Sequence, residues 1–127
     1  LAGCGGATAG PGAVTLVPTV GMTPVMECLD QEVQKLGYKV VRIDREDGYM
    51  TAERWDKKPE ISRPREYGGG DRIEVNRQKT KEKDFSLSLT PSSFIIEWLF
   101  NGQNVKKAET REQVVKDVTT LSERCRL

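Results

Sequence analysis

Residues 38–55 read YKVVRIDREDGYMTAERW, and this stretch decides the fold. It contains two runs of β-prone residues, 38–46 and 49–55, joined by Asp47-Gly48. An Asp-Gly pair favours a two-residue type I′ turn, because both residues tolerate the positive φ angles that such a turn requires. The stretch therefore predicts a β-hairpin, which is stable only when one of its faces packs against the rest of the chain.

The register of this hairpin follows from the turn. With Glu46 opposite Tyr49, Arg42 lies across from Glu53, and a cross-strand pair of opposite charges contributes roughly 0.2–1 kcal/mol. A slip of one residue would move Ile43 to the wrong face. The residues expected on the core face are Val41, Ile43, Met50 and Ala52. The residues expected on the opposite face are Tyr38, Val40, Tyr49 and Trp55.

Three later runs, residues 72–77, 85–90 and 94–100, are also β-prone, and the first two alternate as half-buried strands do. Pro91-Ser92-Ser93 predicts a turn between the last two runs. Asn101-Gly102 predicts a second tight turn, followed by a short return strand. In the last run the side chains expected to point inward are Phe94, Ile96, Trp98 and Phe100, which leaves Ile95 and Leu99 on the opposite face.

Two segments have the period of amphipathic helices. The first begins near Thr23, a suitable N-cap, and ends at Gly37, which can adopt a left-handed conformation. The second spans residues 111–124, where Thr110 and Gln113 form a capping-box pattern. The apolar stripes are Val25, Leu29, Val33 and Leu36 in the first helix, and Val114, Val118, Leu121 and Cys125 in the second.

This order of elements predicts an α+β fold: an antiparallel sheet of four to five strands with two helices packed on one face. If the helices run antiparallel, Cys28 near the start of the first approaches Cys125 near the end of the second. The two cysteines then either form a disulfide, which requires an oxidising compartment, or pack as two buried free thiols.

Residues 56–70, DKKPEISRPREYGGG, interrupt the strand pattern. Two prolines, seven charged residues and three consecutive glycines predict a long loop and argue against a central strand. The loop is either a solvated extension of the hairpin or a segment that binds a partner. Together with the open sheet face, it supplies the candidate partner-binding residues Tyr49, Trp55, Ile61, Arg63, Arg65 and Tyr67.

The composition excludes several classes of function. Lys and Arg number 20 against 19 Asp and Glu, so no excess of positive charge favours nucleic acid. Histidine is absent, which removes the commonest general base and the commonest zinc ligand. Asp44 and Glu53 are the nearest pair of carboxylates for acid–base catalysis, but solvated strand residues explain them more simply. We therefore expect a protein that is not an enzyme, with no cofactor and no metal site.

The N-terminal segment differs from the rest. Residues 5–22, GGATAGPGAVTLVPTVGM, carry no charge and are rich in Gly, Ala, Pro and Thr, which is typical of a flexible tether. Its middle part, residues 13–17, is β-prone and either docks as an edge strand or lies along a partner. We therefore expect a tether over residues 1–22 and a single domain over residues 23–127.

The first four residues, Leu1-Ala2-Gly3-Cys4, resemble the lipobox of bacterial lipoproteins. That resemblance implies that Cys4 carries a lipid after signal-peptide cleavage and anchors the chain to a membrane. Because two or three acyl chains hold a protein stably at a bilayer, the anchor needs no spanning helix. Gly5 follows the cysteine in place of Asp, which by resemblance to Gram-negative lipoproteins implies the outer membrane, facing the periplasm or the cell surface.

Two functions fit these features. The first is a non-catalytic interaction or accessory subunit of a larger cell-envelope assembly, with a protein partner and no nucleic acid. The second is a periplasmic or surface module that binds a small ligand, a lipid or an envelope glycan through the aromatic residues of the open sheet face. A stable protein partner would favour the first, and a ligand retained in the native preparation would favour the second.

Overall fold

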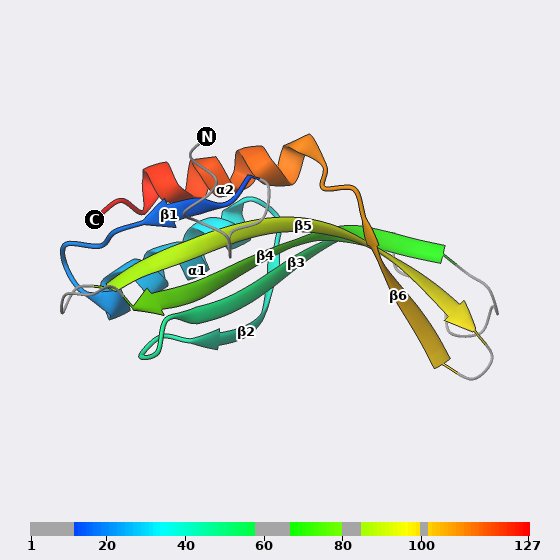
Figure 1. Cartoon of the computed structure of the whole chain (residues 1–127), viewed down its shortest axis with the longest axis horizontal. Coiled ribbons are helices and arrows are strands. Elements are labelled where there is room, and N and C mark those ends of the chain that lie inside the picture. The colour runs from blue at the N-terminus through cyan, green and yellow to red at the C-terminus, as the bar shows by residue number, and fades with distance from the viewer. Residues whose placement is uncertain (1–11, 58–66, 80–84, 100–101) are drawn as a thin grey trace.

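The computed structural model describes residues 12–57, 67–79, 85–99 and 102–127 (Figure 1). The α+β class is confirmed: among the described residues, the strands form one antiparallel sheet, two helices accompany it, and more residues lie in strands than in helices. The elements are β1 (Val14–Leu16), α1 (Met22–Lys35), β2 (Lys39–Asp44), β3 (Tyr49–Lys57), β4 (Tyr67–Lys79), β5 (Phe85–Leu99), β6 (Gly102–Ala108) and α2 (Glu112–Arg124).

Five strands lie in the order β1-β5-β4-β3-β2, and β6 also pairs with β5. Strand β1 pairs with residues 87–89 of β5, whereas β6 pairs with residues 93–99. The two short strands therefore share one edge of β5, and Pro91 falls between them. Since proline has no backbone N–H, this gap in the outer ladder is where a strand tolerates it.

The predicted turn at Pro91-Ser92-Ser93 is therefore wrong, because β5 runs without interruption through these residues. The alternation of side chains continues across Pro91 instead of starting afresh. As a result, Phe94 lies on the face opposite to Leu87 and Leu89, and Ile95 lies on the same face as they do, with 44% of its surface exposed. Phe94 and Ile96 are buried as predicted, at 5% and 6% exposure, but they lie on the face opposite to Leu87 and Leu89; the side chains of residues 98–100 lie outside the described part of the chain.

Part of the predicted tether belongs to the folded domain. Residues 14–16 dock as an edge strand, which is one of the two alternatives for this segment, and Leu16 is only 3% exposed in the core. The backbone N–H of Thr19 donates to the carbonyl oxygen of Leu127 at 2.8 Å, so the segment after β1 is also joined to the C-terminus. Cys4 lies outside the described residues.

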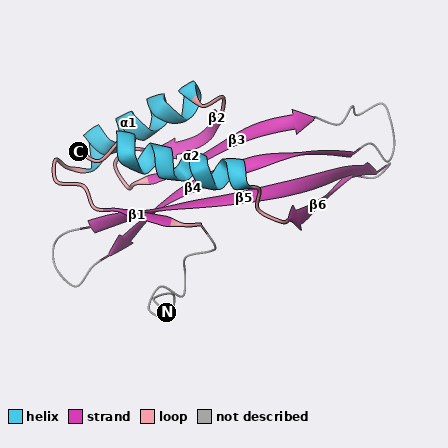
Figure 2. Cartoon of the chain, turned by 90° about the horizontal axis from the view of Figure 1, so that it is seen from above, coloured by secondary structure: helices cyan, strands magenta, loops and turns pink. Residues whose placement is uncertain are grey.

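A hydrophobic core unites the helices and the sheet. Its fully buried side chains each contribute roughly 1.5–3 kcal/mol by leaving water. Figure 2 shows α1 and α2 side by side above the strands. The core residues are Leu16, Val25, Met26, Leu29, Val33, Tyr38, Met50, Ala52, Ile73, Val75, Leu87, Leu89, Val114, Val118, Leu121 and Cys125.

The helix ends differ partly from the prediction. Gly37, with φ 94°, ends α1 as expected, and its N–H donates to the carbonyl oxygen of Gln34 at 3.0 Å. The N-cap of α1 is Gly21 and not Thr23. The N-cap of α2 is Arg111, which replaces the predicted capping box at Thr110; its own N–H donates to Ser93 Oγ at 3.0 Å. A contact with the sheet therefore fixes the start of α2.

The predicted two-residue turn of the hairpin is also wrong. Asp44 pairs with Tyr49, and residues 45–48 form the turn between them. Asp44 Oδ1 accepts hydrogen bonds from the N–H groups of Glu46 at 3.1 Å and Asp47 at 3.0 Å. An aspartate that bonds the backbone two and three residues later stabilises a wider turn. This side-chain contact moves the closing pair of the hairpin away from the position that the Asp-Gly pair predicts.

The three glycines at 68–70 lie inside β4, between β3 and β5, which corrects the predicted loop over residues 56–70. Glycine is required there because neighbouring backbones approach closely. A Cβ atom on Gly69 would lie 2.8 Å from the carbonyl oxygen of Phe94, and one on Gly70 would lie 2.3 Å from that of Arg54. Ile61, Arg63 and Arg65 lie outside the described residues.

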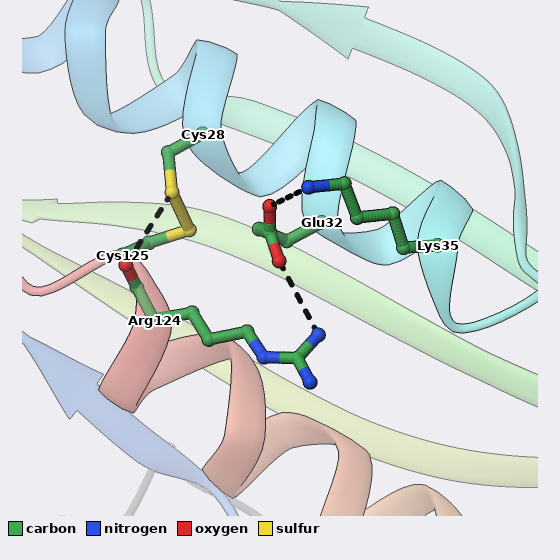
Figure 3. Close-up of a disulfide and its surroundings, with 5 residues drawn as sticks. All are labelled: Cys28, Glu32, Lys35, Arg124 and Cys125. Atoms are coloured by element: carbon green, nitrogen blue, oxygen red, sulfur yellow. Dashed lines mark hydrogen bonds and ion pairs between the residues drawn. A yellow bond between two sulfur atoms is a disulfide. The ribbon is translucent and has the colours of Figure 1, made fainter.

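A disulfide joins the two helices. Cys28 in α1 is bonded to Cys125 at the end of α2, with 5.6 Å between their Cα atoms (Figure 3). Beside it, Arg124 of α2 forms an ion pair of 3.3 Å with Glu32 of α1, which also pairs with Lys35 at 2.8 Å. Of the two alternatives for the inner cysteines, the structure shows the disulfide.

Replacement of both Cys28 and Cys125 by alanine should lower the free energy of unfolding by about 4–5 kcal/mol, because the bond closes a long loop in the unfolded chain. Their sequence separation is 97 residues. Urea unfolding of the variant and the parent protein, both with Cys4→Ser, measures the difference. Incorporation of alkylating reagent into the unfolded, unreduced parent would contradict the bond.

Candidate functional site

The two faces of the sheet differ in chemistry. Along β3, Met50 and Ala52 point into the core, so Thr51 and Glu53 point to the other side. We call that other side the open face. Its described residues include Arg42, Thr51, Glu53, Trp55, Arg72, Glu74 and Phe94.

A β-bulge in β2 changes the alternation at the edge of the sheet. The register with β3 shifts between Val40, which pairs with Ala52, and Arg42, which pairs with Thr51. Val40 and Ile43 both pack against the core, so the bulge places Val41 and Arg42 together on the open face. Val41 is 49% exposed there. Bulges of this kind re-aim side chains at the edge of a sheet.

These residues line a shallow hollow that we call the open-face groove. Its volume is about 410 Å³, and it crosses β2, β3 and β4. The lining residues are Val41, Arg42, Thr51, Glu53, Arg72 and Glu74.

Two of the four charges in the groove neutralise each other. Glu53 Oε2 accepts hydrogen bonds from Arg72 Nε at 3.0 Å and from Arg72 Nη2 at 2.7 Å. The Arg72 guanidinium also lies 5.0 Å from the ring centroid of Phe94, which contacts Trp55 edge-to-face at 5.0 Å. These contacts replace the predicted Arg42–Glu53 pair, because the wider turn and the bulge place Lys39 across from Glu53.

The other two charges in the groove have no such contact. Within the part of the chain that the structure describes, no hydrogen bond or ion pair involves the side chains of Arg42 and Glu74. Both residues are exposed. The groove therefore presents one cation and one anion to solvent.

A second polar cluster lies on the helix side of the sheet and is centred on buried carboxylates. Its centre is Asp71 of β4, which is 1% exposed. Arg111 binds this carboxylate with two nitrogens, each at 2.9 Å, and Ser93 Oγ donates to it at 2.8 Å. Arg54 Nη2 adds a contact at 3.2 Å, and Arg111 also pairs with Asp56. Because its oxygens are bonded, the buried charge is compensated.

The same cluster continues to Asp117 of α2, which is 3% exposed. Arg54 Nη2 lies 3.0 Å from its Oδ2, Tyr38 Oη donates to that oxygen at 2.7 Å, and Gln113 Nε2 donates to Oδ1 at 3.0 Å. Burial, together with the hydrogen bond to Asp117, raises the pKa of Tyr38. The cluster thus joins β3, β4 and α2 with compensated charges, and we assign it a structural role.

The predicted site residues are separated by the structure. Trp55 and Tyr49 belong to β3; Trp55 packs against Phe94, and Tyr49 is 41% exposed beside the turn. Tyr67 begins β4.

Two residues predicted on the open face lie elsewhere. Tyr38 is 3% exposed in the core, because it precedes β2 and its hydroxyl reaches Asp117. Val40, also predicted on the open face, packs against the core.

The sequence prediction missed both the unpaired Arg42–Glu74 combination and the buried cluster. Asp117 carried a signal: it stands between Val114 and Val118 in the apolar stripe of α2, where a carboxylate needs a buried partner. Asp71 carried none, because it follows glycines that predicted a loop.

No protein-family model matches this chain, and no curated protein matches it. Among the described residues, neither helix is long and apolar enough to cross a membrane.

Substitution Tyr38→Phe should destabilise the protein by about 1.5–3 kcal/mol near pH 8, because it removes a buried hydrogen bond to a charged group. The raised pKa adds a pH dependence. In the unfolded chain Tyr38 ionises near pH 10.0, whereas the folded state keeps its proton, so its contribution is present below that pH and is lost as pH rises.

The difference in unfolding free energy between the parent protein and Tyr38→Phe should therefore narrow above pH 10.0. Urea unfolding from about pH 8 to about pH 11 measures it. Tyr49→Phe, at an exposed position, serves as the control. A constant difference across this range would contradict the assigned role of Tyr38.

Proposed function

We propose that the protein is a lipid-anchored, non-catalytic lipoprotein of the bacterial cell envelope that acts as an interaction or accessory subunit of a larger assembly. The observation that carries this proposal is the open-face groove. Among the described residues, both helices lie on the other side of the sheet (Figures 1 and 2), and the bulge in β2 directs Val41 and Arg42 onto the side away from these helices.

The position of the N-terminal segment supports the same proposal. Strand β1 lies at one end of the strand order and β2 at the other, so a lipid on Cys4 would hold the domain by the edge remote from Val41 and Arg42. Gly12 lies against Val115 of α2 and Pro91 of β5. An anchor there leaves the open face accessible to a partner in the same envelope, on the outer membrane by our reading of Gly5.

The disulfide supports an envelope location. Disulfides persist in oxidising compartments such as the bacterial periplasm and are rare in the cytosol. A bond between Cys28 and Cys125 therefore fits a secreted chain better than a cytosolic one.

The contacts of the two carboxylates considered for acid–base catalysis support a non-catalytic role. Glu53 is ion-paired with Arg72, and Asp44 accepts hydrogen bonds from the turn. Both candidate acids thus have structural partners.

A module for a small ligand, a lipid or an envelope glycan is the second candidate. Trp55 favours it, because this half-buried side chain, packed against the buried Phe94, places part of an aromatic surface on the same face as the groove. A glycan or lipid retained by the native protein would support this candidate over a protein partner.

Intact mass spectrometry of the native protein from membranes tests the anchor. We expect a chain that begins at Cys4 and carries two or three acyl chains, because one chain alone binds membranes only marginally. A Cys4→Ser variant should be soluble and unmodified. A native chain that retains Leu1 with an unmodified Cys4 would refute the anchor.

Photo-crosslinking in the native envelope tests the docking face. A photoreactive amino acid at Thr51, in the floor of the groove, should form a single defined adduct with a partner protein. The same amino acid at Lys116, on the exposed side of α2, serves as the control. Equal crosslinking from both positions, or none from Thr51, would contradict a role of this face in protein docking.

A further inference from the structure

The unpaired charges of the groove lie in one row across the sheet. Arg42 of β2 pairs in register with Thr51 of β3, which pairs with Glu74 of β4. Arg42 and Glu74 are thus separated by two strand spacings, roughly 9–10 Å between backbones. Thr51 between them has a short side chain, so the row has a cation at one end, an anion at the other and a low centre.

The neighbouring row across the sheet, Glu53 and Arg72, needs no charged group from a binding partner. Glu53 and Arg72 also face each other in register, and their ion pair of 2.7 Å compensates both. Whatever covers the groove must therefore match two charges, a negative group for Arg42 and a positive group for Glu74. Val41, half exposed beside Arg42, adds an apolar contact at the edge.

We propose that the groove binds an extended peptide segment that carries an acidic and a basic residue two positions apart, the carboxylate on Arg42 and the cation on Glu74. This inference rests on the proposed use of the open face by a protein partner. In an extended chain, residues two positions apart point to the same side and lie roughly 6.5–7 Å from each other. Long side chains span the remaining distance to Arg42 and Glu74.

A second copy of this chain is a less suitable occupant. It would offer Glu74 to Arg42 and Arg42 to Glu74, but it would also bring its own Glu53 and Arg72 against those of the first copy. Removal of so many charges from water costs several kcal/mol for each ion unless new partners compensate. A single peptide strand along the row covers Arg42, Thr51 and Glu74 and leaves the Glu53–Arg72 pair at its margin.

Titration of the whole domain with capped peptides at low ionic strength tests the proposal. The probes are the acetylated and amidated peptides Gly-Asp-Thr-Lys-Gly, Gly-Asp-Thr-Asp-Gly and Gly-Lys-Thr-Lys-Gly. The parent protein should bind the first up to roughly fivefold more tightly than either of the others, since each exposed ion pair is worth up to about 1 kcal/mol. Added salt should reduce this preference.

Charge reversal should switch the preference. Glu74→Lys leaves two cations in the row and should bind the Asp/Asp peptide best, whereas Arg42→Glu leaves two anions and should bind the Lys/Lys peptide best. Glu123→Lys, on the exposed side of α2, makes the same change in net charge as Glu74→Lys and should keep the peptide preference of the parent protein. Both groove positions are exposed, so these variants should fold, which circular dichroism checks.

Failure of the parent protein to bind the Asp/Lys peptide, or an unchanged preference in the reversed variants, would overturn the inference. Concentration-dependent dimerisation that Glu74→Lys abolishes would overturn it in favour of a second copy. These results are separate from the proposed function: a crosslinked partner at Thr51 without any charge preference would refute this mode of recognition and leave docking through the open face intact.

Discussion

The buried carboxylate of Asp71 is the constraint on which much of the rest depends. An ionised group at 1% exposure is tolerated only with close partners, and here Arg111, Arg54 and Ser93 supply them. These partners come from three places along the chain: β3, β5 and the N-cap of α2. The need to compensate one charge therefore fixes the start of α2 over the sheet and holds the central strands beneath it.

The helix layer is held at two points of different chemistry. At the N-cap and in the N-terminal half of α2 the contacts are ionic, through Arg111 and Asp117. At its C-terminal end the contact is covalent, because Cys125 is bonded to Cys28 of α1, with the Arg124–Glu32 ion pair beside it (Figure 3). Between them the packing is apolar.

The two faces of the sheet therefore differ in the contacts that their side chains make. The helix side is occupied by the core and by a cluster whose charges are compensated. The open face keeps the shallow groove, in which Glu53 and Arg72 are paired while Arg42 and Glu74 are not. The bulge in β2 connects the two faces, because it keeps Val40 and Ile43 in the core while it turns Val41 outward. The residues of the core and the residues of the groove therefore come from the same strands.

The sequence alone determined the class of the fold, the existence of both helices, the end of α1 at Gly37 and the strand character of most of the sheet. These features depend on local periodicity and on the conformational freedom of single residues, which a sequence displays directly. It also placed Cys28 and Cys125 where two antiparallel helices bring them together, and it marked Tyr49 and Trp55 as residues outside the core.

Only the tertiary structure decided the register of the hairpin, the course of β5 through Pro91 and the place of the glycines at 68–70 in β4. Each depends on a contact with a residue distant in sequence or on a side chain that bonds the backbone: the gap between β1 and β6 beside Pro91, and the close approach of Arg54 to Gly70. The groove was decided in the same way, because Arg42 and Glu74 become neighbours across Thr51 only when three strands align, and no local pattern encodes that alignment.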